Sequence, residues 1–218
     1  MRASTLGVAL LLLGAHLPSP AADEIRVVQA STVPARELSV AANATHALRL
    51  SVYNFAGTRW SADEIRSAVI ESARLLAQCR VALAGVELRV LEAPRRFHFY
   101  STPVSRELLR TIDVSKPAVF FVEDTRNRPA FDAEAIGLGN AGSRPELANT
   151  VWIAYGARDL PYALAHELVH VLSDSGDHSS EPDNLMRPGT SPRNAELSDA
   201  QCERLRSHGE VNGLLERR

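Results

Sequence analysis

Two histidines and the glutamate beside the first of them are the residues of this chain best suited to chemistry. They stand in the run His166-Glu167-Leu168-Val169-His170. Residues four apart in a helix lie on the same face, so His166 and His170 can present two imidazole nitrogens to one metal ion. Zinc is the usual occupant of such a pair. The spacing therefore predicts a zinc site on a helix.

Glu167 follows the first histidine by one position, which is about 100° around a helix of 3.6 residues per turn. Its carboxylate is therefore placed to reach a water molecule on the metal rather than to bind the metal in the same way. We expect Glu167 to act as the general base that activates a zinc-bound water, and to pass the proton to a leaving amine. The alternative is two histidines on a helix surface beside a glutamate that forms a salt bridge.

A catalytic zinc ion needs a third protein ligand and one open position. The helix is expected to end near Ser175-Gly176, after which the chain turns back with His178, the best third ligand. Zinc also accepts oxygen ligands, so three nearby carboxylates are alternatives: Asp174, Asp177 and Glu181.

Together with the later run Asn184-Leu185-Met186, these residues resemble the metzincin clan of zinc metalloproteases. Those enzymes carry two histidines and a glutamate on an active-site helix, then a third histidine, then a turn whose methionine lies beneath the metal. The resemblance implies a zincin-like fold, zinc as cofactor, hydrolysis of peptide bonds in a peptide or protein substrate, and Met186 as the Met-turn residue. Its motifs cover Pro161 to Met186, and the order of elements extends it loosely over residues 47–206.

The chain departs from the common metzincin spacing. That pattern has a glycine three residues after the second histidine and the third histidine three residues later. Ser173 and Gly176 occupy these positions here, and His178 comes two residues late. Either the helix runs about half a turn further or the third ligand is not His178. A tyrosine that stabilises an oxyanion in some of these families is not identified, since none closely follows Met186.

Two other functions fit the same residues. One is a non-catalytic zincin-like module that binds zinc, or no metal, and a protein partner. The other is a gluzincin-like hydrolase whose third ligand is a downstream glutamate, with Glu196 and Glu203 as candidates.

The periodicity of apolar residues predicts the elements that must position this site. Capping boxes at Ser61 and Ser198 open a long helix in the N-terminal half and a C-terminal helix. Asp159 is expected to cap the active-site helix and Pro161 to lie in its first turn, while Gly85 is expected to break the chain before a strand. The order indicates one α/β (α+β) domain with a mixed, mostly parallel sheet. The strands are expected at residues 47–55, 86–91, 117–123 and 150–155, and a short helix at 105–112.

A glycine-spaced segment from Ala135 to Gly142 could be an irregular edge strand. In the related enzymes an extended peptide pairs with the edge of the sheet. The resemblance thus implies that Gly137, Leu138 and Gly139 contact the substrate backbone; a plain loop is the alternative.

The beginning of the chain resembles a secretory signal. Arg2 precedes an apolar run, residues 6–13, which is too short to span a membrane, and small residues follow at Ala21 and Ala22. We therefore expect export to the periplasm or the outside. Residues 1–22 would be the signal peptide, 23–45 an N-terminal extension or a first strand, and 46–218 the catalytic domain.

Composition limits the alternatives further. The chain has 218 residues, of which 45% are hydrophobic, which suits one domain with a real core. A net charge of −2 gives no reason to expect nucleic acid as a partner. Cys79 and Cys202 would form a disulfide in an exported protein. They could instead be two buried thiols, or Cys79 could inhibit the site as a zinc ligand.

Overall fold

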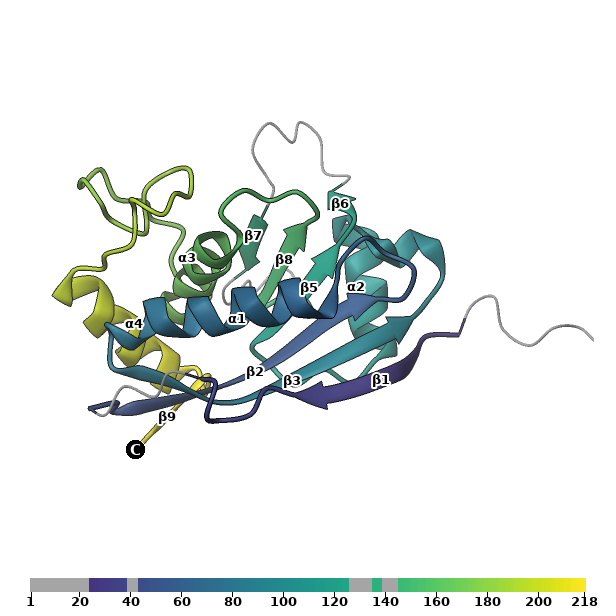
Figure 1. Ribbon diagram of the computed structural model, residues 1–218, viewed down its shortest axis with the longest axis horizontal. Helices are drawn as coiled ribbons and strands as arrows, with labels where there is room; N and C mark the ends of the chain where they lie inside the picture. Colours follow the sequence, from purple (N-terminus) through teal and green to yellow (C-terminus); the bar gives the residue numbers. More distant parts are fainter. Residues whose placement is uncertain (1–23, 39–42, 126–134, 139–144) are drawn as a thin grey trace, which may run out of the picture.

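The computed structural model describes residues 24–38, 43–125, 135–138 and 145–218. In this part of the chain, four helices and a mixed, mostly parallel sheet form an α/β fold (Figure 1), as the sequence predicts. The helices are α1 (Ala62–Ala77), α2 (Thr102–Thr111), α3 (Leu160–Ser173) and α4 (Asp199–Val211), with a 3₁₀ turn η1 (Arg95–His98). The strands are β1 (Arg26–Thr32), β2 (His46–Phe55), β3 (Val81–Glu92), β4 (Phe99–Tyr100), β5 (Ala118–Val122), β6 (Asp124–Thr125), β7 (Ala135–Leu138), β8 (Thr150–Ala154) and β9 (Leu215–Arg217).

The main sheet has the strand order β1-β3-β2-β5-β8-β7. Its four inner strands are parallel, while β1 and β7 pair antiparallel with β3 and β8 at the two edges. Strand β9 adds an antiparallel pair to the start of β2, and β4 and β6 form a separate short sheet. The segment at residues 26–32, for which an extension and a first strand are both considered, is thus a strand of the sheet.

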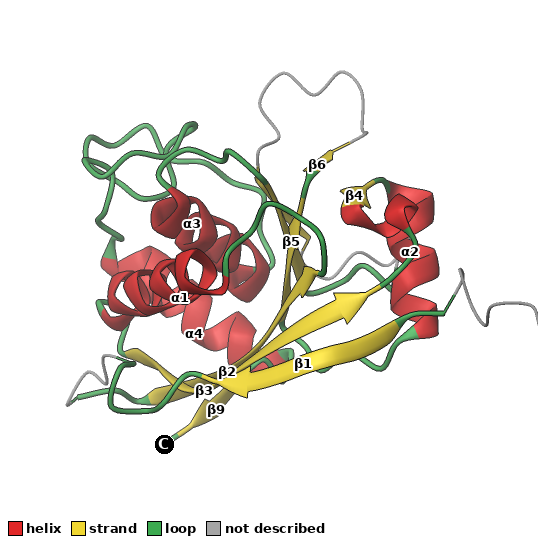
Figure 2. Ribbon diagram, turned by 45° about the vertical axis from the view of Figure 1, so that its right-hand side comes forward, coloured by secondary structure: helices red, strands yellow, loops and turns green. Residues whose placement is uncertain are grey.

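Strand β5 is buried on both faces, as expected for a central strand. Because side chains alternate along a strand, Val119 and Phe121 join a core cluster with α1, α3 and α4, whereas Phe120 joins a second cluster on the other face. In that second cluster Phe120 stacks on Tyr53 and on Trp152. Figure 2 shows the same division, with α1, α3 and α4 on one side of the sheet and α2 on the other.

The predicted N-cap at Ser61 and the predicted capping box at Ser198 are confirmed. The Ser61 side chain accepts a hydrogen bond from the Glu64 N–H at 3.1 Å and opens α1. At α4 both bonds of the box are present, between Ser198 and Gln201. The apolar faces of these helices then bury against the sheet and against α3.

Two local predictions are wrong. Gly85 does not break the chain: it lies inside β3 where the pairing with β2 shifts register, a place where strand glycines are common. Asp159 precedes α3 but adopts a left-handed backbone, φ 51°, and makes no capping bond with its side chain. Helix α3 ends at Ser173 with Asp174 as its C-cap, so it stops before Gly176, as predicted.

Cys79 and Cys202 form a disulfide bond that joins the residue after the α1 C-cap to α4. No helix in the described ranges is long and apolar enough to cross a membrane. The predicted signal peptide, residues 1–22, lies outside the described residues, as do Gly139 and the rest of the predicted edge segment to Gly142.

Candidate metal centre

Helix α3 places His166 and His170 one turn apart on a single face. Pro161 lies in the first turn of the helix, as predicted, and the apolar residues that follow bury it against α1, α4, β7 and β8. Both histidines are enclosed by this packing, with 4% of His166 and 8% of His170 exposed. Their imidazoles form an edge-to-face pair with ring centroids 4.6 Å apart.

The third histidine returns to this face because the chain reverses at the end of α3. Asp174 takes the left-handed conformation, φ 47°, and its N–H donates to the carbonyls of His170 and Val171. The reversed segment is then held by the Ser179 N–H, which donates to the Met186 carbonyl at 2.8 Å. His178, the neighbour of Ser179, thereby reaches the two helix histidines from outside the helix.

This reversal accounts for the unusual spacing of His178. Helix α3 includes Ser173, which occupies the glycine position of the metzincin pattern, and the left-handed residue that ends the helix is Asp174, one position later. The second additional residue lies in the loop between Asp174 and His178. The expected half-turn extension of the helix is therefore only partly realised.

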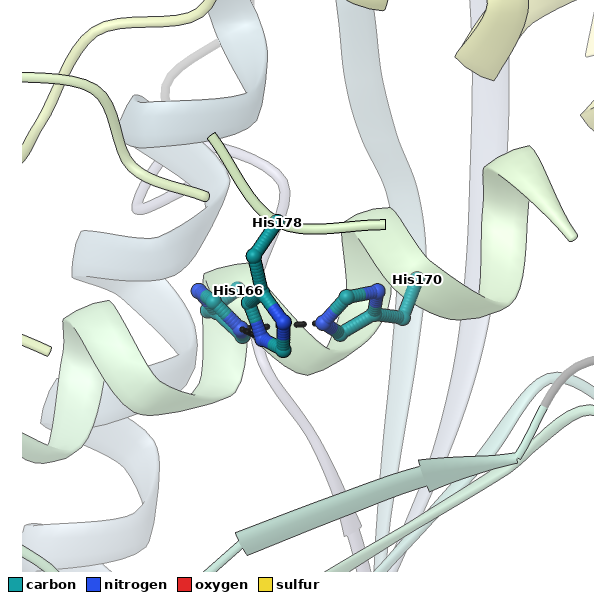
Figure 3. Close-up of side chains that lie close together, drawn as sticks. All are labelled: His166, His170 and His178. Atoms are coloured by element: carbon teal, nitrogen blue, oxygen red, sulfur yellow. Dashed lines mark hydrogen bonds between the residues drawn. The ribbon is translucent and has the colours of Figure 1, made fainter. Parts of the chain in front are cut away.

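The Nε2 atoms of the three histidines converge on one point (Figure 3). His166 Nε2 lies 3.0 Å from His170 Nε2 and 3.3 Å from His178 Nε2, and all three ligand atoms lie within 4.8 Å of one another. Two nitrogens bound at about 2.0–2.1 Å to one tetrahedral zinc ion would lie about 3.3 Å apart. The cluster thus has the dimensions of a three-histidine metal site.

Backbone carbonyls determine which nitrogen of each helix histidine carries hydrogen. His166 Nδ1 donates to the Leu185 carbonyl at 2.7 Å, and His170 Nδ1 donates to the Ser175 carbonyl at 2.6 Å. A carbonyl oxygen only accepts, so Nδ1 is protonated and the Nε2 of each neutral imidazole bears a lone pair. Lone pairs that face each other at about 3 Å repel, and a shared cation removes the repulsion. The donor set therefore fits a metal ion.

Burial also keeps these imidazoles neutral. The pKa of His166 is lowered to about 4, chiefly by burial and also by the neighbouring His170 and His178, while the hydrogen bond to the Leu185 carbonyl opposes the shift. Burial likewise lowers the pKa of His170. Neutral imidazole is the form that binds metals, so at neutral pH these two side chains are ready to bind an ion.

The other predicted site residues surround this cluster. Glu167 is half-buried next to His166 on α3, and Met186 is buried with 3% of its surface exposed. Within the described part of the chain, the group that could hold a metal consists of the three histidines and includes no carboxylate. Asp177, an alternative ligand, instead pairs with Arg204 of α4 at 3.1 Å.

A pocket of about 140 Å³ borders the cluster. His178 and Met186 line it together with Gln201 and Arg204 of α4. Val169, one turn before Ser173 on α3, gives it an apolar wall. An open space thus lies directly beside the third histidine.

Several residues that shape the site carry no signal in the sequence. The carbonyls of Leu185 and Ser175 orient two histidines, but every residue has a carbonyl, so composition and spacing cannot identify them. Gln201 is recognisable as part of a capping box, yet its contact with Asn184 depends on how α4 packs.

A comparison with models of known protein families finds no match, and a comparison with curated proteins finds none either.

Proposed function

We propose that this chain is an exported zinc-dependent metallopeptidase related to the metzincins. The observation that carries the proposal is the convergence of three histidines, with His166 Nε2 at 3.0 Å from His170 Nε2 and at 3.3 Å from His178 Nε2. In His166 and His170 the Nδ1 atoms are bound to backbone carbonyls. A cluster built in this way favours a divalent cation, and three neutral imidazoles suit zinc in particular. His166, His170 and His178 would be its three protein ligands.

When bound, zinc supplies a Lewis acid that polarises a carbonyl group and lowers the pKa of a coordinated water molecule to about 7. Glu167 supplies the base. Placed one residue after His166 and half-buried, its carboxylate takes a proton from the attacking water and delivers it to the leaving amine. Met186, buried next to His178, provides apolar packing under the histidines in the role of a Met-turn residue.

The substrate in this proposal is an extended peptide. Strand β7 lies at the edge of the sheet, antiparallel to β8, and packs next to α3. A peptide that added a strand along Gly137 and Leu138 would receive backbone hydrogen bonds while it passed the histidine cluster. Export is supported by the disulfide, because such bonds persist in oxidising compartments outside the cytosol.

The deciding experiment is Glu167→Gln, measured as cleavage of a peptide library together with zinc content. We expect activity to fall by about 10²-fold or more, since the general base is lost, while about one zinc per chain is retained. The matched control is Glu203→Gln on α4, an exposed glutamate outside the histidine cluster, which should keep both zinc and activity.

Each other outcome contradicts part of the proposal. An active Glu167→Gln protein would reject the base, and loss of zinc in Glu203→Gln would favour the gluzincin-like alternative. Zinc binding without turnover by the wild type on any peptide would favour the non-catalytic module.

A further inference from the structure

A pair of side-chain amides joins the loop beside the histidine cluster to the C-terminal helix. Asn184 Nδ2 donates to Gln201 Oε1 at 2.9 Å, and Gln201 Nε2 donates to Asn184 Oδ1 at 3.1 Å. Asn184 is buried, with 6% exposed, and Gln201 is half-buried. Buried or partly buried amides that satisfy each other in this way fix the relative position of the two segments.

The Asn184 side chain also shapes its own loop. Its Oδ1 accepts a hydrogen bond from the Met186 N–H at 2.9 Å, which closes a tight turn around Leu185. On one side of this turn the Leu185 N–H donates to the Glu196 carbonyl at 2.7 Å. On the other side the Leu185 carbonyl accepts from His166 Nδ1 at 2.7 Å. The turn therefore sets the direction of the carbonyl that orients His166.

The orientation of the two amides is fixed by backbone donors. Gln201 Oε1 accepts a hydrogen bond from the Ser198 N–H at 2.8 Å as well as from Asn184, and Asn184 Oδ1 is held by Met186. If either amide turned over, a nitrogen would face a backbone N–H. A glutamate at position 201 keeps the acceptor but has no donor for Asn184 Oδ1, and a leucine has neither.

We propose that Gln201 is a positioning residue for the histidine cluster. Through Asn184 and the Leu185 carbonyl it holds the His166 imidazole with Nε2 towards His170 and His178. Partners of this kind, one step removed from a metal, change metal affinity by about 10–100-fold when they are removed. The inference rests on the proposed function in one respect only, that the cluster binds zinc.

The test compares Gln201→Leu and Gln201→Glu with Ser198→Ala, which removes the cap hydroxyl of the same helix but leaves the amide pair in place. Two properties are measured: zinc affinity by competition with a chelator, and the ¹⁵N NMR signals of the His166 ring in the zinc-free protein. We expect Gln201→Leu to weaken zinc binding about tenfold or more and to shift the His166 Nδ1 signal. Gln201→Glu should do both to a smaller extent, and Ser198→Ala neither.

A purely structural role for Gln201 predicts a different result. Suppose that Ser198→Ala and Gln201→Leu lower the melting temperature equally and also weaken zinc binding equally. Gln201 would then act only through the stability of α4, and the proposal would be rejected. It is also rejected if Gln201→Leu leaves both zinc affinity and the His166 signal unchanged. Should Gln201→Leu fail to fold, Gln201→Glu, which keeps the acceptor for Ser198, decides by the same two measurements. The NMR readout needs neither zinc nor cleavage, so failure of this inference can be told from failure of the peptidase proposal.

Discussion

At the scale of single residues, the site depends on which ring nitrogen of each histidine donates a hydrogen bond and which one keeps a lone pair for a metal. In His166 and His170 the Nδ1 donates a hydrogen bond to a backbone carbonyl, so the Nε2 of each ring keeps a lone pair that points at the cluster. His178 differs, because it is exposed and comes from a loop rather than from the helix. The contribution of His178 is therefore the part of the site most open to a direct test.

We expect His178→Ala to reduce zinc affinity by at least about 100-fold, because a ligand should matter more than the outer partners that account for about 10–100-fold. Zinc titration against a chromophoric chelator measures this. The matched control is His208→Ala, an exposed histidine on α4, which should bind zinc as the wild type does. A carboxylate ligand would be indicated if Asp177→Ala lost zinc and His178→Ala kept it.

At the scale of elements, the two helices that flank the loops of the site begin in different ways. Helix α4 has a complete capping box at Ser198, whereas α3 begins at Asp159, whose side chain makes no capping bond. Tertiary packing of α3 replaces the missing cap, since its apolar residues are buried between the sheet and its neighbouring helices. The full capping-box sequence at Ser198 thus forms its hydrogen bonds, whereas the single capping residue predicted at Asp159 does not.

The N-terminal ends of α3 and α4 should therefore respond differently to substitution of their capping residues. Ser198→Ala is expected to lower the free energy of unfolding by about 1 kcal/mol, the usual effect of losing a bonded N-cap. Asp159→Gly is expected to change it by less than about 0.5 kcal/mol, because relief of the left-handed backbone, φ 51°, is offset by the greater freedom of glycine in the unfolded chain. Urea denaturation of the two variants measures both values. A loss of about 1 kcal/mol in Asp159→Gly would mean that Asp159 does cap α3.

At the scale of the whole molecule, the disulfide joins the two halves of the chain. It links Cys79 to Cys202 across 123 residues, and both half-cystines are buried in the cluster that contains α1, α3 and α4. Next to it, the Gln78 side chain bonds the Ala195 carbonyl and the Leu197 N–H. The early helix α1 thus helps to hold the segment that precedes α4 and follows the histidine loop.

Removal of the disulfide should destabilise the whole fold. For a closed loop of this length the chain-entropy model gives about 4–5 kcal/mol. We expect the double substitution Cys79→Ala and Cys202→Ala to lower the free energy of unfolding by up to that amount, measured by urea denaturation of the oxidised wild type and the variant. Equal midpoints would show that the cross-link contributes nothing to stability.

The sequence by itself determines the local features of this protein. Periodicity of apolar residues predicts the central strand β5, the helix α3 that carries His166 and His170, and the long first helix α1, because these patterns follow from the geometry of a single element. The spacing of His166 and His170 predicts that they share a face for the same reason. His178 is identified only as the best of several candidates.

Tertiary structure decides what depends on contacts between segments distant in the chain. It selects the three histidines over the nearby carboxylates, because the chain reverses at Asp174 and the Ser179–Met186 bond holds the returning loop. It also provides the carbonyls of Leu185 and Ser175, which face the histidines only after the loops pack on α3 and α4. Residue type encodes which side chains can bind a metal, but the direction of a backbone carbonyl is set by the fold.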